Sequence, residues 1–241
     1  MKVDRWEDYQ TFFQLIILRY LIVWFSLVPV IAGFIDQLPN PLPITLMGVE
    51  YKIELTLPFH WQLLWLSSLF FVIALGLFKF FCPKFVQKYN SFSEYRSYNN
   101  HPRWLTWETH KLLKIATNKQ KQKLVERLNA KKYLTLLKVN INKDLCESPV
   151  VKEKQTVLQF KVDDKSYEFG MPILSSTCNN ESEKDVFYEL FGRYSESHYK
   201  VRFIIKVLLI ISLLLFLWVL IEHIFNGAIF VKDWILGFCN R

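Results

Sequence analysis

Three long apolar runs separate the polar parts of the chain. They cover residues 12–35, 61–81 and 203–221, and each is close to the ~20 apolar residues that a membrane-spanning helix needs. A buried helix of a soluble protein seldom runs so far with so few charges. The pattern therefore predicts an α-helical integral membrane protein with three transmembrane helices. A cleaved signal peptide is the alternative for the first run, but the run is too long and only Ala32-Gly33 suggests a cleavage site.

Lysine and arginine near the ends of the runs predict the orientation of the chain. Lys2 and Arg5 precede the first run, whereas Lys52 is the one basic residue of the loop at 36–60. Basic residues gather at both ends of the segment 83–200: Lys79, Lys84, Lys88 and Arg96 at its start, and Arg193, Lys200, Arg202 and Lys206 at its end. This bias places the N-terminus and the segment inside the cell, and the loop and the C-terminus outside.

The predicted topology divides the chain into six parts. They are an N-terminal tail with the first span (1–35), a periplasmic loop (36–60), the second span (61–82), a cytoplasmic α+β domain (83–200), the third span (201–225) and an outer tail (226–241). Turn residues in the loop predict a hairpin over 44–57, or else a loop that packs against the spans. The tail around Trp234 predicts an interfacial helix on the outer leaflet, or else a continuation of the third span.

Helical periodicity opens the cytoplasmic segment. Aromatic residues at helical spacing predict one short helix with an aromatic face: Phe85, Tyr89, Phe92 and Tyr95. Asn99 and Asn100 suit the C-terminal cap of this helix, and Pro102 prevents its continuation. Two further helical patterns follow, at 103–117 and 121–137.

Strand character takes over around Asp163-Asp164. Residues 156–170 alternate on both sides of this pair, which predicts a hairpin with a short turn, and residues 134–141 are a candidate third strand. The stretch 182–200 then predicts an amphipathic helix whose apolar side consists of Val186, Phe187, Leu190 and Tyr194. Because only Gly192 interrupts its pattern, we expect this helix to continue directly into the third span.

Charge is segregated within the cytoplasmic segment. Residues 84–143 contain fourteen basic and three acidic side chains, a net charge of +11. Residues 144–199 contain eleven acidic and six basic side chains, a net charge of −5. We expect the two halves to attract each other, or complementary surfaces on a partner or on a neighbouring copy.

A row of basic residues is the main candidate for a binding surface. Lys119, Lys123, Arg127 and Lys131 are four residues apart, so on a helix they would form one basic face, with Lys132 beside it. A solvated face or a contact with anionic lipid ranks first, a protein partner second and nucleic acid third. The stretch 111–132 lacks the aromatic side chains on which single-strand binders stack bases, which weakens the nucleic-acid hypothesis.

Motifs for catalysis are missing from the sequence. It has no glycine-rich phosphate loop, no metal-ligand spacing and no nucleophile paired with a base, so we expect neither an enzyme nor a bound cofactor or metal. His101 and His110 flank two tryptophans, a pattern that more often serves packing. The four cysteines, Cys82, Cys146, Cys178 and Cys239, are interpreted as structural or incidental.

Charges inside the apolar runs would mark an ion path if they were paired. Lys79 and Lys206 lie near the predicted cytoplasmic ends, where their long side chains can reach the headgroups. Arg19 lies deeper, but no acid lies inside any run. We therefore interpret Arg19, Lys79, Lys206 and the outer Trp234 as interfacial anchors.

The stretch "CPKFVQKYNSFSEY" at 82–95 enters the cytoplasm directly from a span. Together with the layout of the whole chain, it resembles the membrane subunit of the bacterial Kiwa antiphage defence systems. The resemblance implies an inner-membrane sensor that oligomerises and holds a DNA-binding effector at the inner face. It assigns no functional residue.

The residues themselves favour a non-enzymatic integral membrane sensor or scaffold. Its cytoplasmic domain would recruit a cytosolic protein partner, while the outer loop and tail would respond to the envelope. The alternative is a pore-forming effector or an ion-channel subunit. Ion leakage from liposomes containing the purified protein would distinguish the two functions.

Overall fold

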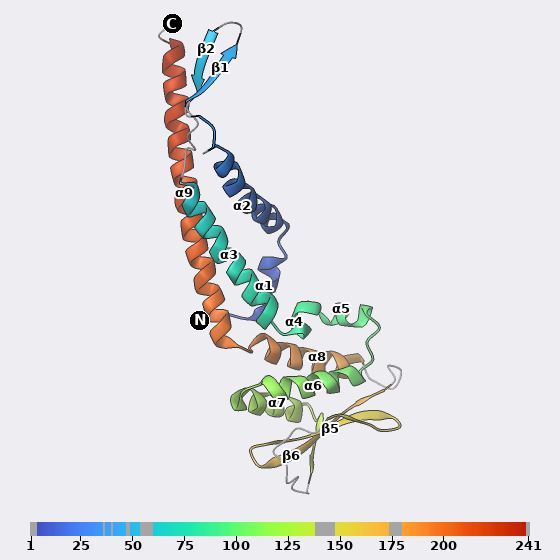
Figure 1. The fold of residues 1–241 in the computed structure, drawn as a ribbon. Helices are drawn as coiled ribbons and strands as arrows, with labels where there is room; N and C mark the ends of the chain where they lie inside the picture. The colour runs from blue at the N-terminus through green and yellow to red at the C-terminus, as the bar shows by residue number, and fades with distance from the viewer. Residues whose placement is uncertain are drawn as a thin grey trace. The chain divides into compact units, whose positions relative to one another are not determined.

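The computed structural model describes residues 4–35, 37–39, 41–46, 49–53, 60–137, 148–173 and 180–239. These residues form a mostly helical protein with two small antiparallel sheets (Figure 1). The chain divides into two compact units. We call Met1–Gln10 with Cys82–Tyr199 the polar unit, and Thr11–Phe81 with Lys200–Arg241 the apolar unit.

Three long helices and a hairpin make up the apolar unit. They are α2 (Ile16–Ile35), α3 (Trp61–Phe81), α9 (Tyr199–Cys239), β1 (Leu42–Leu46) and β2 (Val49–Ile53). The strands pair antiparallel from Leu42↔Ile53 to Leu46↔Val49, which confirms the hairpin that turn residues predict. Residues 54–57, the end of the predicted hairpin, lie outside the described residues.

Two described helices are long and apolar enough to cross a membrane: α3 and the stretch Tyr199–Ile229 of α9. The core helix of a soluble protein passes the same test but is mostly buried, whereas only 33% and 17% of the most apolar windows are buried here. The helix α2 occupies the first predicted span, starting after a break at Gln14-Leu15. A third crossing by α2 remains a prediction.

Two serines join α3 to α9 within the apolar unit. The Ser67 hydroxyl donates to the Ser212 carbonyl oxygen at 2.8 Å, and the Ser212 hydroxyl donates to the Ser67 carbonyl oxygen at 2.9 Å. On α9, Ile205, Ser212 and Val219 are buried and recur every seven residues. Small polar residues of this kind let two apolar helices approach closely and hydrogen-bond.

The helix expected to run from the polar unit into the third span is interrupted. Helix α8 (Asn180–Ser195) ends before α9 begins at Tyr199. His198, between them, has a φ of 50°, and a left-handed residue ends an α-helix. The prediction of one continuous rod was therefore wrong. At its other end α9 is continuous to Cys239, so the tail continues the third helix instead of forming a separate one.

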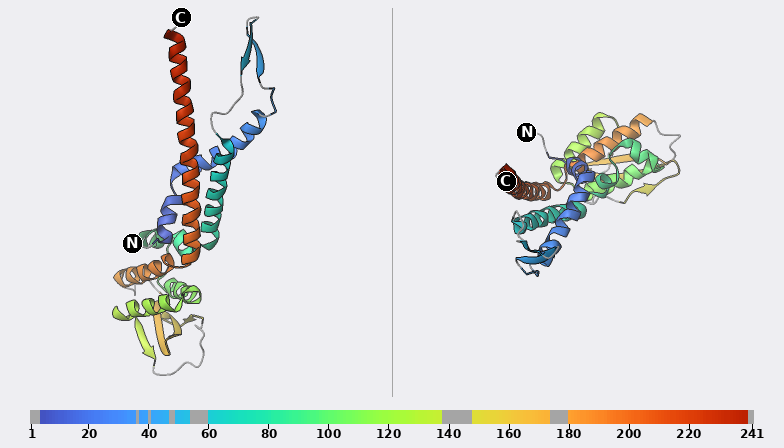
Figure 2. Two further views of the ribbon diagram at one scale, coloured as in Figure 1. Left: turned by 90° about the vertical axis from the view of Figure 1, so that its left-hand side faces the viewer. Right: turned by 90° about the horizontal axis from the view of Figure 1, so that it is seen from above.

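The polar unit is built in layers (Figures 1 and 2). Its four-stranded sheet has the order β3-β6-β5-β4, with bounds Leu134–Leu137, Lys165–Pro172, Gln155–Val162 and Val150–Val151. Helices α6 (Arg103–Ile115) and α7 (Asn118–Ala130) pack on the sheet, and α8 packs on both helices. Two short helices, α4 (Lys84–Lys88) and α5 (Phe92–Ser97), pack in turn on α8.

The predicted hairpin around Asp163-Asp164 is confirmed. These residues have φ values of 50° and 60°, as a tight two-residue turn requires, and they join β5 to β6. The strand expected at 134–141 pairs with β6 over Leu134–Leu137, while residues 138–141 lie outside the described residues. Because the chain turns into a strand at Leu134, α7 ends at Ala130 and the helix expected to reach 137 is shorter.

In place of the single aromatic helix that the sequence predicts, the structure has two helices, α4 and α5, whose aromatic residues pack on the ring of Phe187. Ser91 caps α5 by accepting a hydrogen bond from the Glu94 amide, and this cap separates α5 from α4. The buried Phe187 of α8 lies 5.2 Å from Phe85 and 5.3 Å from Tyr95, measured between ring centroids. The aromatic residues thus share one core with the apolar side of α8, although they do not belong to one helix.

Candidate interaction surface

Helix α7 carries most of the basic row. The Thr117 amide donates to Oε1 of Gln120 at 3.0 Å, which caps the start of the helix. Leu124, Val125 and Leu128 are buried at three- and four-residue spacing, so one side of α7 is fixed against the rest of the polar unit. The opposite side is therefore presented to the surroundings.

Lys119, Lys123 and Arg127 are exposed on that opposite side. Within the described residues, no ion pair joins these three side chains to an acid. Such exposed basic groups are available to a negatively charged partner. The three side chains form the surface that we call the α7 basic face.

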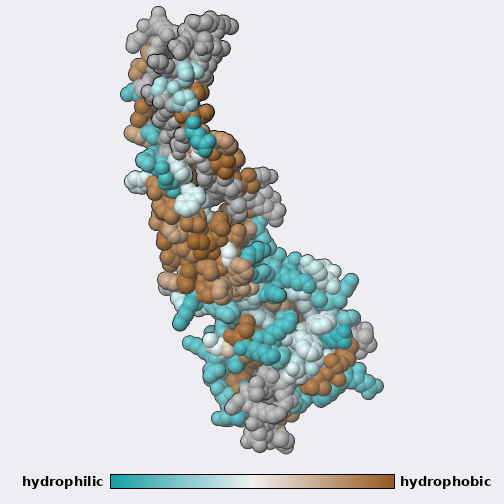
Figure 3. Space-filling model, in the orientation of Figure 1, coloured by the Kyte–Doolittle hydropathy of each residue, from teal (hydrophilic) through white to brown (hydrophobic). Residues whose placement is uncertain are grey.

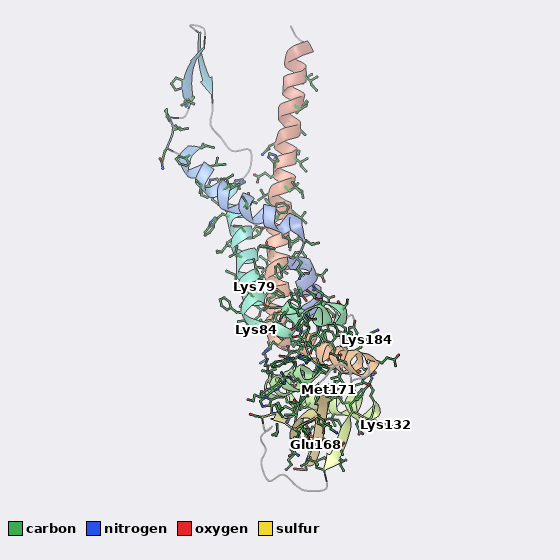
Figure 4. The ribbon with its side chains drawn as sticks, turned by 90° about the vertical axis from the view of Figure 1, so that its right-hand side faces the viewer. Lys79, Lys84, Lys132, Glu168, Met171 and Lys184 are labelled. Carbon is green, nitrogen blue, oxygen red and sulfur yellow. The ribbon has the colours of Figure 1, made fainter. Side chains whose placement is uncertain are left out.

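The remaining two residues of the predicted row differ from the first three. Lys131 follows the end of α7, and its Nζ lies 3.4 Å from Asp185 and 3.2 Å from Glu189 on α8. Burial favours the neutral amine, but the hydrogen bonds and charges of the two acids outweigh it and raise the pKa of Lys131. Lys132 is exposed in the turn before β3, with a φ of 61° (Figure 4). Lys131 thus forms ion pairs within the chain, whereas Lys132 remains accessible to a partner.

A second ion pair joins the basic half of the cytoplasmic segment to its acidic half. The guanidinium of Arg96 lies 3.0 Å from Oε2 of Glu183, whose side chain is fully buried. The other oxygen, Oε1, has no hydrogen-bond partner among the described residues. Burial raises the pKa of Glu183, and the charge of Arg96 opposes that shift. Together with the Lys131 pairs, this contact shows that the two halves attract each other within the chain.

The predicted interfacial anchors all lie on the long apolar helices. Lys79 is exposed in the last turn of α3, where a positive charge suits the helix dipole (Figure 4). Lys206 is exposed near the start of α9. Arg19 belongs to α2 and Trp234 to α9, but their side chains lie outside the described residues. An anchoring role remains a prediction for all four.

The described residues contain no group of three or more His, Cys, Asp or Glu side chains that could hold a metal ion. Of the two histidines beside the tryptophans, His101 is exposed and His110 is buried. Cys82 is buried, Cys239 ends α9, and Cys146 and Cys178 lie outside the described residues.

The N-terminal helix α1 (Trp6–Phe13) and the residue before it make contacts with the polar unit that the sequence pattern did not predict. Trp6 is fully buried in the polar unit, and its indole N–H donates to the Ser197 carbonyl oxygen at 3.0 Å. Arg5 lies 3.7 Å from Glu196, and the Gln10 amide donates to the Gln87 carbonyl oxygen at 3.2 Å. The amphipathic spacing of Trp6, Tyr9 and Gln10 could have indicated a helix, but not its partner.

Comparison with known proteins assigns no site to this chain. No protein-family model, no curated protein and no solved structure matches it.

Proposed function

We propose that this chain is a non-enzymatic sensor or scaffold of the bacterial inner membrane, which oligomerises and recruits a cytosolic protein partner through its polar unit. The observation that carries the proposal is the contrast between the two units. The apolar unit exposes large apolar side chains along α3 and α9, whereas the polar unit encloses an apolar core beneath a charged surface (Figure 3).

Exposed apolar area supports the membrane part of the proposal. Trp218 and Ile221 on α9 are each 66% exposed, and Val72 on α3 is 51% exposed. Each Å² of apolar surface left in water costs roughly 25 cal/mol, so a surface of many such side chains needs an apolar medium. Lipid acyl chains would supply that medium around α3 and around the part of α9 that lies beside α3.

The α7 basic face supports the recruitment part. Within the described residues its three cations form no ion pair with an acid, whereas Lys131 and Arg96 pair with acids of the same chain. A partner with an acidic surface would complement the basic face and orient itself on it. Nucleic acid ranks behind a protein, because Asn118–Ala130 contains no aromatic residue.

From the resemblance to the Kiwa membrane subunit we further propose that the partner is a DNA-binding antiphage effector, held at the inner face of the membrane. The competing pore hypothesis has less support. Among the described residues of α3 and of 203–221 in α9, Lys79 and Lys206 are the only charged ones, and Ser67 and Ser212 satisfy each other.

Charge reversal on the basic face tests the recruitment. Replacing Lys119, Lys123 and Arg127 with glutamate should reduce partner capture by about tenfold, since three reversed charges cost on the order of 1–2 kcal/mol at a screened interface. Capture is measured by chemical cross-linking and mass spectrometry in bacterial cells that express the chain with its neighbouring genes. Insertion into the membrane should not change.

The matched control reverses three exposed lysines elsewhere on the polar unit, Lys154, Lys165 and Lys184. It alters the net charge equally, so a loss of capture confined to the α7 variant assigns the effect to the basic face. Equal capture by both variants and the unmodified chain would contradict the proposal. Loss of binding to anionic vesicles without loss of the protein partner would instead assign the face to lipid.

A further inference from the structure

Helix α9 continues beyond the point where α3 accompanies it. The backbone N–H of His60, next to the start of α3, donates to Oε2 of Glu222 at 3.2 Å, and the His60 ring contacts Oε1 of the same carboxylate. The 21 residues of α3 are about 31 Å long at 1.5 Å per residue, which matches the ~30 Å hydrocarbon core of a bilayer. Residues His223–Cys239 extend α9 by about a further 25 Å.

This extension exposes apolar side chains that α3 does not cover, beside the polar Asn226 and Lys232. Ile224, Val231 and Ile235 are 61%, 52% and 50% exposed, and Ala228 between them is also exposed. An isolated helix with such a surface is unfavourable in water. If α3 and the accompanying part of α9 already cross the bilayer, hydrocarbon does not reach the extension, and another surface must cover it.

The spacing of these residues indicates a helix as that surface. Ile224, Ala228, Val231 and Ile235 are separated by four, three and four residues, the repeat of the seam in a coiled coil. The same alternation continues toward the start of α9 through exposed residues: Phe203, Val207, Ile210, Leu214, Leu217 and Ile221. A facing helix can contact this row along its length, while Phe225 and Leu236 are exposed outside it.

We call the row of Ile224, Ala228, Val231 and Ile235 the seam. The surface around it also has a shape that a facing helix can fit. An open, shallow hollow on the extension is lined by six residues: Gly227, Ala228, Val231, Lys232, Ile235 and Leu236. Four of them, Ala228, Val231, Lys232 and Ile235, stand at positions i, i+3, i+4 and i+7, the spacing of the four residues that form the hole for one side chain of a facing helix. The small residues Gly227 and Ala228 allow a second helix to approach closely.

We propose that His223–Cys239 pairs in parallel with the same segment of a second copy of this chain, as a coiled coil. The proposal rests on the proposed function, because copies inserted in a membrane in one orientation present α9 in the same direction. Two copies related by a two-fold axis then bury the same seam on both sides. The contact assigns the predicted oligomerisation to a particular surface outside the paired α3–α9 region.

Disulfide cross-linking of the full chain tests this pairing. Cys146, Cys178 and Cys239 are replaced with serine, and the buried Cys82 is retained and measured as background in that parent chain. Single cysteines are introduced as Ile224→Cys, Ile235→Cys and, as the matched control, Ile229→Cys. Ile229 is exposed and apolar like the others, at 43%, but lies off the seam. Each purified chain is reconstituted in vesicles with a large excess of lipid and oxidised.

The parallel pair predicts that both Ile224→Cys and Ile235→Cys form disulfide-linked dimers, several-fold more than Ile229→Cys. The two seam positions are about 16 Å apart along the helix, so an antiparallel pair would not bring both into self-contact. Equal cross-linking at all three positions, none at the seam, or cross-linking at only one seam position would overturn the proposal. Recovery of each chain in the membrane fraction is measured separately. A chain that does not insert into the membrane is thereby distinguished from one that inserts but does not pair.

Discussion

Replacing Trp6 with alanine should lower the free energy of unfolding of the polar unit by about 3–5 kcal/mol, the usual cost of removing a fully buried large aromatic side chain. Trp6 has no exposed surface, and its indole N–H is bound to the Ser197 carbonyl oxygen. Ser197 lies in the break between α8 and α9, so Trp6 fixes the last turn before the chain enters α9. Alanine would leave a cavity and would remove this hydrogen bond.

Hydrogen exchange of the full chain in detergent micelles measures this effect. Protection factors of α6 and α8 amides should fall by about 100- to 4000-fold, given that every 1.4 kcal/mol is a factor of ten. The control is Trp104→Ala, because Trp104 is 45% exposed and its loss should cost about 1 kcal/mol or less. If Trp6→Ala changed hydrogen exchange only within residues 4–10, Trp6 would not contribute to the stability of the polar unit. The N-terminal helix would then be peripheral to its core.

Replacing Arg96 with methionine should destabilise the polar unit by about 3 kcal/mol at pH 7. Methionine keeps much of the volume of arginine but leaves the buried Glu183 without its counter-charge. The value lies at the low end for buried pairs because Arg96 is 34% exposed and partly screened by solvent. It is also limited because Glu183 can take up a proton instead of remaining charged.

The destabilisation by Arg96→Met should depend on pH in a defined direction. Burial raises the pKa of Glu183 above its ordinary value of 4.5, and removal of Arg96 removes the charge that opposes this shift. A raised pKa in the folded state means that the protonated form is preferred on folding. The penalty is therefore present at neutral pH and should disappear as the pH falls to 4.5.

Protection factors of α8 amides, compared with those of the unmodified chain at pH 7 and at pH 4.5, measure this difference. The double variant Arg96→Met with Glu183→Gln is the control, since a neutral amide needs no counter-charge and should restore most of the stability at pH 7. A penalty that stays constant with pH, or one that the glutamine does not relieve, would show that Arg96 acts through packing and not through its charge.

Features with a local signal could be predicted from the sequence. The hairpin of β5 and β6 follows from Asp163-Asp164 between alternating residues, and Val186, Phe187 and Leu190 are buried as the period of α8 requires. These predictions depend on neighbours within a few residues. The physical information for them is contained in the stretch itself.

Features that depend on distant residues could not be predicted. The hydrogen-bond partner of Trp6, Ser197, lies 191 residues away in the sequence, and the residues around Trp6 do not predict it. Lys131 continues the basic row in sequence, but the end of α7 and the acids of α8 direct it into an internal ion pair. The break before α9 depends on a left-handed φ at His198, a conformation that hydrophobic periodicity does not register.

Labelling of single cysteines in intact cells tests most directly whether the segment between the apolar helices faces the cytosol. Chains that retain only Cys146, only Cys178 or only Cys239 are treated with a thiol reagent that does not cross the membrane. The account predicts labelling of Cys239 in intact cells, and of Cys146 and Cys178 only after the cells are lysed. Labelling of Cys146 or Cys178 in intact cells, with Cys239 protected, would invert the topology and remove the basis for recruitment of a cytosolic partner.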